Sequence, residues 1–148
     1  MTVPVRVWIA SVIVLRQDQV LLMRRAGTLA GAWCQVAGKI EQGEAAWQTG
    51  LRELAEETRL VPQAYWSADY LETFYEPARD IVTVGPVFVA RVAPDAEPRL
   101  NEEHDAYRWL SFGPARDLVS FGGQRQMLSW VEQEFVHRAP SPHLEIAL

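Results

Sequence analysis

Residues 38–60, GKIEQGEAAWQTGLRELAEETRL, decide the fold of this chain, and their centre is the hexapeptide RELAEE at residues 52–57. On a helix, Glu53, Glu56 and Glu57 are spaced i, i+3, i+4, so three carboxylates lie on one face within one turn of ~5.4 Å. Like charges at this spacing destabilise a helix by roughly 0.2–0.5 kcal/mol per pair. The cluster therefore indicates either a solvated acidic face or a site for a hard divalent cation, because Mg²⁺ binds carboxylate oxygens.

The spacing of the neighbouring residues favours the metal site. Five residues separate Gly38 from Glu44, seven separate Glu44 from Arg52, and Leu60 follows the last carboxylate by three positions. This pattern resembles the Nudix box, the signature of hydrolases that cleave diphosphate linkages, over the whole stretch.

One position departs from the family pattern, because Arg59 stands where the family usually has glycine. Glycine suits this position because the residue that ends a helix often takes the left-handed backbone conformation. An arginine in that conformation costs roughly 1–2 kcal/mol. We expect either this strained conformation or a different helix end. Arg59 lies beyond the carboxylates, so the departure concerns the turn and leaves the chemistry intact.

The resemblance implies an α/β fold of the Nudix type, an α/β/α sandwich with a mixed β-sheet. Hydropathy periodicity alone indicates only mixed α and β structure. We expect one domain over residues 1–148, with the box at 38–60 and a C-terminal tail at 139–148 that is either mobile or adds to a partner's sheet. A homodimer is a further expectation from the family.

The resemblance also implies hydrolysis of a small-molecule phosphoanhydride with Mg²⁺, or alternatively Mn²⁺, as the cofactor. The implied metal ligands are Glu53, Glu56, Glu57 and the carbonyl of Gly38. Glu103 is the best candidate for a second-site carboxylate, because the family carries an acidic residue ahead of a closing strand such as EHDAYRWL at 103–110. One residue of loop slip would exchange it with Glu102. The general base is then Glu53 or Glu103.

Two further residues of the box have expected supporting roles. Arg52, four positions before Glu56, is expected to hold that carboxylate in place and so belongs to the catalytic set. Glu44 is expected to open the box helix and to fix the junction between loop and helix by hydrogen bonding.

Three residues outside the carboxylate cluster are candidates for binding substrate: Arg25, Trp33 and Lys39. Only one of the adjacent Arg24 and Arg25 can face a given side of the sheet. Trp33 has a ring that stacks on a base, although a tryptophan beside a strand more often covers the core. The Val36-Ala37-Gly38 sequence, together with residues 103–110, is similar to the branch acting on pterin and deoxynucleoside triphosphates.

Net charge and cysteine content exclude some classes of protein. A net charge of −5 argues against a general nucleic-acid surface, so an anionic substrate must be met locally. The single cysteine, Cys34, excludes an internal disulfide and fits a reducing compartment, and we expect a cytoplasmic protein. The apolar run at 8–15 is too short to span a membrane and lacks a cleavage pattern.

The periodicity of apolar residues, together with the glycines and prolines that interrupt helices and strands, predicts the remaining elements. A hairpin joins strands at 5–15 and 20–24, and the apolar stripe of the box helix includes Gly50, which suggests close approach to the sheet. Pro86 places the strand at 81–92 at an edge or a bulge, or divides it in two. The other expected elements are strands at 65–75 and around 107–110, a short helix at 114–118 and a helix at 124–137 opposite the box helix.

Three alternatives remain for the function. A nucleotide-binding module without activity would lose box carboxylates, and none is missing. An isomerase of isoprenyl diphosphates would need a cysteine in an Asn-x-Cys context, which Cys34 lacks. A hydrolase of nucleotide sugars or dinucleoside polyphosphates would share the box, because the fold does not set the substrate.

Overall fold

Strand β2 (Ile9–Arg16) lies at the centre of the molecule and sends alternate side chains into two separate cores. Val12 and Val14 face one core, whereas Ile13 and Leu15 face the other. Because both faces of the strand are covered, its sequence is a continuous apolar run instead of an alternating one. The computed structural model describes residues 2–148.

The strands form one mixed sheet in the order β1-β7-β2-β3-β4, with β5 paired to β2, β6 to β7 and β8 to β3. β7 runs parallel to both β1 and β2, and the other pairings are antiparallel. The remaining strands are β1 (Val5–Val7), β3 (Gln19–Arg25), β4 (Trp33–Cys34), β5 (Val36–Lys39), β6 (Ala64–Glu76), β7 (Ile81–Arg91) and β8 (His104–Leu110).

The sheet divides along β2. The first half of β2 pairs with β5, whereas β3 pairs with β2 only at Leu15 and Arg16 before it turns away to join β4 and β8. β3 and β5 therefore diverge, and Gln35, the residue between β4 and β5, lies at the divide. This arrangement brings β5, which opens the box, next to the end of the box helix.

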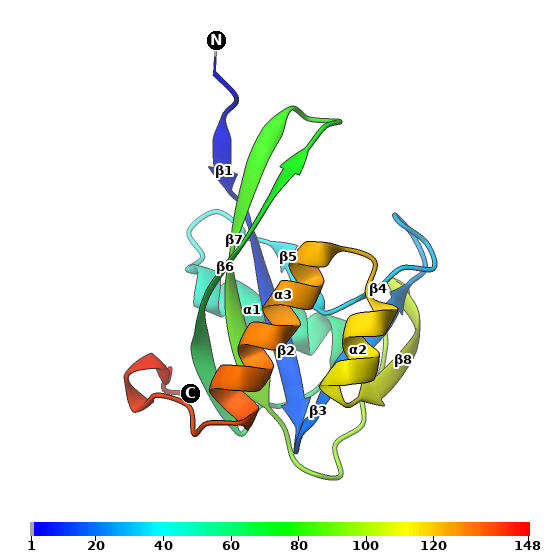
Figure 1. Cartoon of the computed structure of the whole chain (residues 1–148), viewed down its shortest axis with the longest axis vertical. Coiled ribbons are helices and arrows are strands. Elements are labelled where there is room, and N and C mark those ends of the chain that lie inside the picture. The colour runs from blue at the N-terminus through cyan, green and yellow to red at the C-terminus, as the bar shows by residue number, and fades with distance from the viewer. Residues whose placement is uncertain (1) are drawn as a thin grey trace.

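Helices cover both faces of the sheet, so the predicted α/β/α sandwich is confirmed (Figure 1). The box helix α1 (Ala46–Thr58) lies behind the sheet, and α2 (Phe112–Leu118) and α3 (Gly122–Val131) lie in front of it. The last helix thus packs opposite the box helix, as predicted. None of the helices in residues 2–148 is both long and apolar enough to cross a membrane.

Gly50 allows the box helix to approach the sheet closely. A Cβ at this position would meet the hydroxyl of Tyr65 at less than 3.0 Å and a methyl group of Val12 at 3.0 Å. The Tyr65 hydroxyl uses this space to donate a 3.0 Å hydrogen bond to the carbonyl of Trp47. Glycine is therefore required for packing, as its place in the apolar stripe suggests.

Several predicted boundaries were wrong. The strand expected at 5–15 is interrupted at Trp8, because β7 pairs with β1 at Val82–Val84 and with β2 at residues 87–91. Pro86 falls between these two pairings, and β7 stays continuous through it. Of the alternatives expected at Pro86, the bulge is present: Leu71 pairs with Pro86 and Ser67 with Phe88, so the extra residues lie on β6, opposite this part of β7.

Both long helices also differ from their predicted ranges. The box helix begins at Ala46, two residues after Glu44, and Glu44 belongs to the preceding loop. The last helix begins at Gly122, ahead of the expected residue 124, and continues after Val131 as a π-helical turn, η1 (Glu132–Val136).

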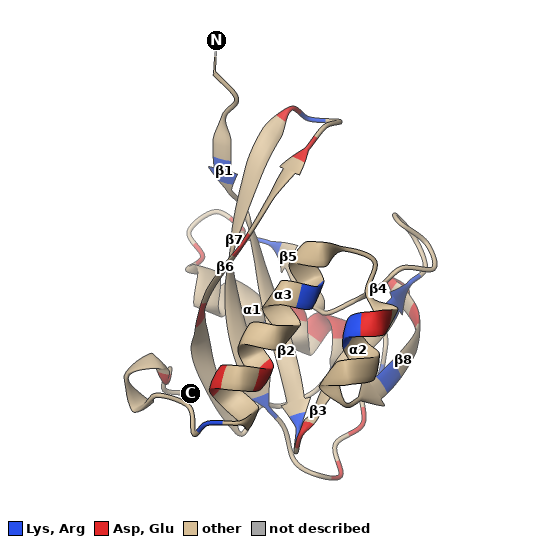
Figure 2. Ribbon diagram, viewed as in Figure 1, with Lys and Arg blue, Asp and Glu red and all other residues tan. Residues whose placement is uncertain are grey.

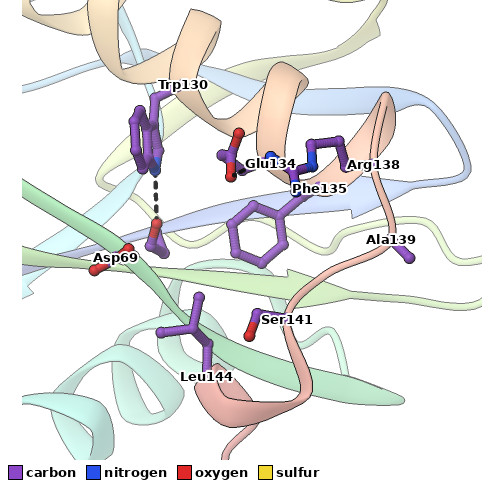
Figure 3. A pocket seen from close by; sticks show the side chains of 9 residues that line it. Asp69, Trp130, Glu134, Phe135, Arg138, Ala139, Ser141 and Leu144 are labelled. Carbon is purple, nitrogen blue, oxygen red and sulfur yellow. Dashed lines mark hydrogen bonds and ion pairs between the residues drawn. The ribbon is translucent and has the colours of Figure 1, made fainter.

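The C-terminal tail lies along the chain's own strand β6, in contrast to both predicted states. The backbone N–H of Ile146 donates to the carbonyl of Tyr65 at 2.8 Å, after a short 3₁₀ turn, η2 (Pro142–Leu144). Leu144 and Ile146 pack against the two opposite cores, which explains why the tail is held. A pocket of about 120 Å³ remains between the tail, β6 and the last helix (Figure 3), and no box residue lines it.

Candidate active site

Arg52 is the centre of the hydrogen-bond network in the box. Its Nε and Nη2 atoms donate to the two oxygens of Glu44 at 2.8 and 3.0 Å. Nη2 also donates to the carbonyl of Lys39 at 2.8 Å, and Nη1 donates to Glu53 at 2.8 Å and to Glu56 at 3.3 Å. The expected contact with Glu56 is therefore present, but the principal partner of Arg52 is Glu44.

Glu44 joins the loop to the helix through two further groups. One of its oxygens accepts from the hydroxyl of Thr49 at 2.6 Å and from the backbone N–H of Glu41 at 3.2 Å. The hydrogen bonds from Arg52 and Thr49 lower the pKa of Glu44 to about 2, so the side chain is an anion throughout the neutral range. These are the contacts expected of a residue that fixes the loop–helix junction.

Glu53 lies directly on the α-carbon of Gly38. A Cβ at Gly38 would lie less than 3.0 Å from the end of the Glu53 side chain. Burial raises the pKa of Glu53, whereas its hydrogen bond from Arg52 lowers it. Gly38 is thus needed for close packing, and it keeps the Glu53 carboxylate beside the backbone of β5.

Glu57 is buried beneath the other carboxylates, with a side chain only 2% exposed. Helical spacing predicted one shared face for Glu53, Glu56 and Glu57, but the side chain of Glu57 lies deeper than the other two. Burial, a hydrogen bond with Glu53 and the nearby carboxylates of Glu53 and Glu103 together raise the pKa of Glu57 to about 9. Among the described residues, its Oε2 atom has no hydrogen-bond partner.

Three ligand-type side chains meet at this buried carboxylate. Glu57, Glu103 and His104 each offer an atom that lies within 4.8 Å of the other two. The Nδ1 atom of His104 is 3.6 Å from Glu57 and, like Oε2 of Glu57, has no hydrogen-bond partner among residues 2–148. His104 is therefore a buried member of the site, although sequence reasoning did not select it as a candidate.

Asn101 brings Glu103 to the end of the box helix. Its side-chain N–H donates to the carbonyl of Glu56 at 3.1 Å, and its side-chain oxygen accepts from the backbone N–H of Glu103 at 3.0 Å. The carbonyl of Glu103 accepts in turn from Ala26 at 3.0 Å. Sequence reasoning missed Asn101, because a single loop asparagine carries no signal until its two partners are known.

A row of hydrogen-bonded polar groups, also missed, crosses the sheet next to the site. The amide of Gln124 donates to Gln35 at 3.3 Å, Gln35 donates to the hydroxyl of Ser11 at 3.3 Å, and Ser11 donates to Glu72 at 3.2 Å. Burial raises the pKa of Glu72. The only sequence signals were a serine in an apolar strand and a glutamate in an aromatic one.

Cys34 lies beside this row, with its sulfur 3.6 Å from Nε2 of His104. Burial raises the pKa of its thiol to about 12, so the sulfur is neutral at physiological pH. A buried neutral thiol of this kind is not activated as a nucleophile.

The three predicted substrate-binding residues lie in different surroundings. Arg25 donates from Nε to the carbonyl of Thr28 at 2.8 Å. Trp33 is half-buried and packs against the core on the α3 side, so it covers the core. The ammonium of Lys39 is 5.9 Å from the ring of Trp8, and only the backbone carbonyl of Lys39 joins the Arg52 network.

The donor set of the site suits a hard divalent cation. Carboxylate oxygens predominate, and two buried polar atoms have no partner among the described residues. The pKa of Glu57 is raised by burial and then by neighbouring carboxylates, whose charge a cation would offset. The arrangement can hold phosphate oxygens through such a cation and can accept a proton from water at a carboxylate.

The family model described as the NUDIX domain matches residues 5–131. The chain belongs to the Nudix family. Nudix hydrolases generally use divalent metals such as Mg²⁺, which agrees with the donor set of this site.

Two curated relatives are similar to this chain over part of their own length. An octanoyltransferase from Myxococcus xanthus is 36% identical over 113 residues, which cover 74% of this chain but only 31% of the relative. The asymmetrical bis(5'-nucleosyl)-tetraphosphatase from Sus scrofa is 32% identical over 101 residues, covering 65% of this chain and 67% of the relative. The chain thus spans about a third of the length of the first of these relatives.

A solved structure supports the Nudix fold at lower sequence identity. The Ap4A hydrolase from C. elegans, in a binary complex, superposes with a TM-score of 0.76 over 88% of this chain and 98% of that chain, at 18% identity. The Nudix fold predicted from the box is therefore confirmed.

Arg59, the departure from the Nudix box, takes the conformation that the usual glycine would take. Its φ of 60° lies in the left-handed region, and its N–H donates to the carbonyl of Ala55 at 3.0 Å. Of the two expected outcomes, the structure shows the strained arginine and retains the Nudix helix end.

Proposed function

We propose that this chain is a divalent-metal-dependent Nudix hydrolase that cleaves a diphosphate linkage in a nucleoside triphosphate or a related triphosphate such as a pterin triphosphate. The products would be a monophosphate and pyrophosphate. The observation that carries the proposal is the convergence of the box carboxylate Glu57 with Glu103 and His104, at a site where two buried polar atoms lack partners.

The residues that would hold the cation are Glu53, Glu56, Glu57 and the carbonyl of Gly38. Mg²⁺ is the expected ion, with Mn²⁺ as an alternative. When bound, such an ion neutralises charge on the phosphate oxygens and lowers the pKa of bound water. Arg52 supports this set, because it donates to both Glu53 and Glu56 and anchors them to Glu44.

Glu103 is the better of the two candidate general bases. Its side chain is exposed and, among the described residues, makes no hydrogen bond or ion pair, so it is free to accept a proton from an attacking water. Glu53 is held by Arg52 and packed on Gly38. Water adds to phosphorus, its proton goes to the Glu103 carboxylate, and the phosphoanhydride P–O bond breaks.

A second candidate substrate is a dinucleoside polyphosphate. The relative from Sus scrofa that bears the name bis(5'-nucleosyl)-tetraphosphatase favours this class. Both candidates require the same box chemistry and differ in what lies beyond the cleaved linkage.

The test is to incubate the protein with Mg²⁺ and a panel of nucleoside triphosphates, dinucleoside polyphosphates and nucleotide sugars, and to separate the products by chromatography. We expect monophosphate and pyrophosphate from a triphosphate, and loss of turnover in Glu57→Gln and Glu103→Gln. Glu102→Gln is the matched control, because its carboxyl neighbours Glu103 but is absent from the cluster. Turnover that survives both changes would show that the cluster does not perform the chemistry.

A further inference from the structure

Three cationic side chains surround one tryptophan at the edge of the sheet next to the box. The guanidinium carbon of Arg79 is 4.8 Å from the centroid of the Trp8 ring, that of Arg6 is 5.5 Å away, and the ammonium of Lys39 is 5.9 Å away. Trp8 is fixed from below, because its indole N–H donates to the hydroxyl of Thr83 at 3.0 Å. We call these four residues the Trp8 cluster.

The Trp8 cluster carries more positive charge than its surroundings neutralise. Arg79 is paired with Glu76 at 2.7 Å, whereas Arg6 and Lys39 have no carboxylate within ion-pair distance among residues 2–148. Lys39 is the single lysine of a chain with net charge −5. Neighbouring cations repel one another, and an anion or the face of an aromatic ring offsets that repulsion. Here a single aromatic ring lies next to three cations, so an anion is needed to offset the rest.

The cluster is built from segments that are distant in the sequence. Arg6 is on β1, Lys39 is on β5, and Arg79 is in the turn between β6 and β7. Figure 2 shows basic segments on β1, on β5 and at the tip of the β6–β7 hairpin, which projects from the same end of the sheet as β1. The hairpin and β1 therefore hold cations beside the beginning of the box.

Backbone hydrogen bonds connect this cluster to the candidate active site. The carbonyl of Trp8 accepts from the N–H of Ile40 at 2.9 Å, and the carbonyl of the preceding residue, Lys39, accepts from Arg52 at 2.8 Å. Arg52 holds Glu53 at 2.8 Å. The backbone that carries Trp8 and Lys39 is thus joined through Arg52 to a carboxylate of the candidate active site.

We propose that the Trp8 cluster is an anion subsite for the part of a polyphosphate chain that extends beyond the cleaved linkage. Trp8 positions the cations, and the guanidinium and ammonium groups bind phosphate oxygens. Two kinds of ligand could supply these phosphate oxygens: a nucleoside polyphosphate with free terminal phosphates, and a dinucleoside polyphosphate. This inference rests on the proposed function for its substrate class, but binding of polyphosphate can be measured without turnover.

The first experiment measures binding of inorganic tripolyphosphate by calorimetry in the presence of EDTA. We expect Arg6→Gln and Arg79→Gln each to weaken binding about fivefold and the double variant to weaken it roughly 20-fold, with the effect decreasing as salt is added. Arg6→Lys and Arg79→Lys keep the charge and should retain most of the binding. Arg138→Gln changes net charge equally, far from the cluster, and should leave binding unchanged. Melting temperatures verify that each variant is folded.

The second experiment compares substrates in the presence of Mg²⁺. The double Gln variant should raise KM for adenosine tetraphosphate and diadenosine tetraphosphate and leave ADP-ribose, with its two phosphates, unaffected. A larger rise for adenosine tetraphosphate would identify terminal phosphates as the ligand, and equal rises would identify the internal chain.

Equal tripolyphosphate affinity in the wild type and the double variant, or an equal loss in Arg138→Gln, would overturn the subsite. Absence of turnover on every substrate, with the binding losses intact, would instead overturn the proposed function and leave the subsite standing.

Discussion

Glu57 should make the metal-free protein less stable as the pH rises. In the folded chain its pKa is about 9, compared with the ordinary value of 4.5, because the side chain is buried next to other carboxylates. Between these two values the folded state keeps a proton that the unfolded state has lost. Stability therefore decreases as pH rises through this window, because the unfolded state binds fewer protons than the folded one.

The magnitude follows from the width of the window. Each pH unit between the two pKa values costs ~1.36 kcal/mol, so a change from about pH 5 to about pH 8 removes at most ~4 kcal/mol of stability. Glu57→Gln removes the titrating group and keeps its size. Any fixed cost of the buried amide in the variant cancels when the same protein is compared at the two pH values.

The assay is urea denaturation of the wild type and Glu57→Gln in EDTA at both pH values. The wild type should lose several kcal/mol more than the variant on going to the higher pH. Glu56→Gln is the control, because the Glu56 side chain is 55% exposed and should behave as the wild type does. Equal pH dependence in the wild type and Glu57→Gln would refute the reasoning that this carboxyl is protonated in the folded, metal-free protein.

Three further predictions concern backbone positions in and around the box helix. Gly38→Ala should reduce turnover on the order of 10²-fold with little change in melting temperature, because the new Cβ displaces only the end of the Glu53 side chain. Gly50→Ala should cost about 1–3 kcal/mol in urea denaturation by overpacking, and combining it with Tyr65→Phe should cost less than the sum of the two changes, since the hydroxyl is the group displaced. Arg59→Gly should raise stability by ~0.5–1 kcal/mol, because relief of the left-handed strain exceeds the entropy cost of glycine, whereas Arg59→Ala should bring no gain.

The sequence predicted the sandwich because the box is a contiguous pattern whose spacing reports a helix and its loop. Apolar periodicity predicted the strand that contains β2 and the last helix for the same local reason. The wrong boundaries have non-local causes. Nothing near Pro86 reveals that β7 passes from one parallel partner to the next at that residue, and nothing near Ile146 reveals that β6 offers it a carbonyl.

The residues of the candidate site fall into the same two groups, those with a local signal in the sequence and those without one. Glu53, Glu56 and Glu57 could be named from helical spacing, and Glu103 from its place before a closing strand. The burial of Glu57, the inclusion of His104 and the bridge through Asn101 depend on how β8 meets the end of α1. That meeting is set by the divergence of β3 from β5, which no local pattern encodes.

Several unfavourable features gather in the box and at the end of its helix. A buried acid with an unpartnered oxygen, a left-handed arginine and a glycine that packs on a carboxylate all occur between residues 38 and 59. Two well-filled cores on opposite faces of the sheet supply the stability that offsets these features. A bound cation would reverse the largest of them, because it neutralises the charge that makes Glu57 costly. The destabilisation predicted for the metal-free protein at high pH and the affinity of the site for a divalent cation therefore have one cause, so Glu57→Gln should remove both together.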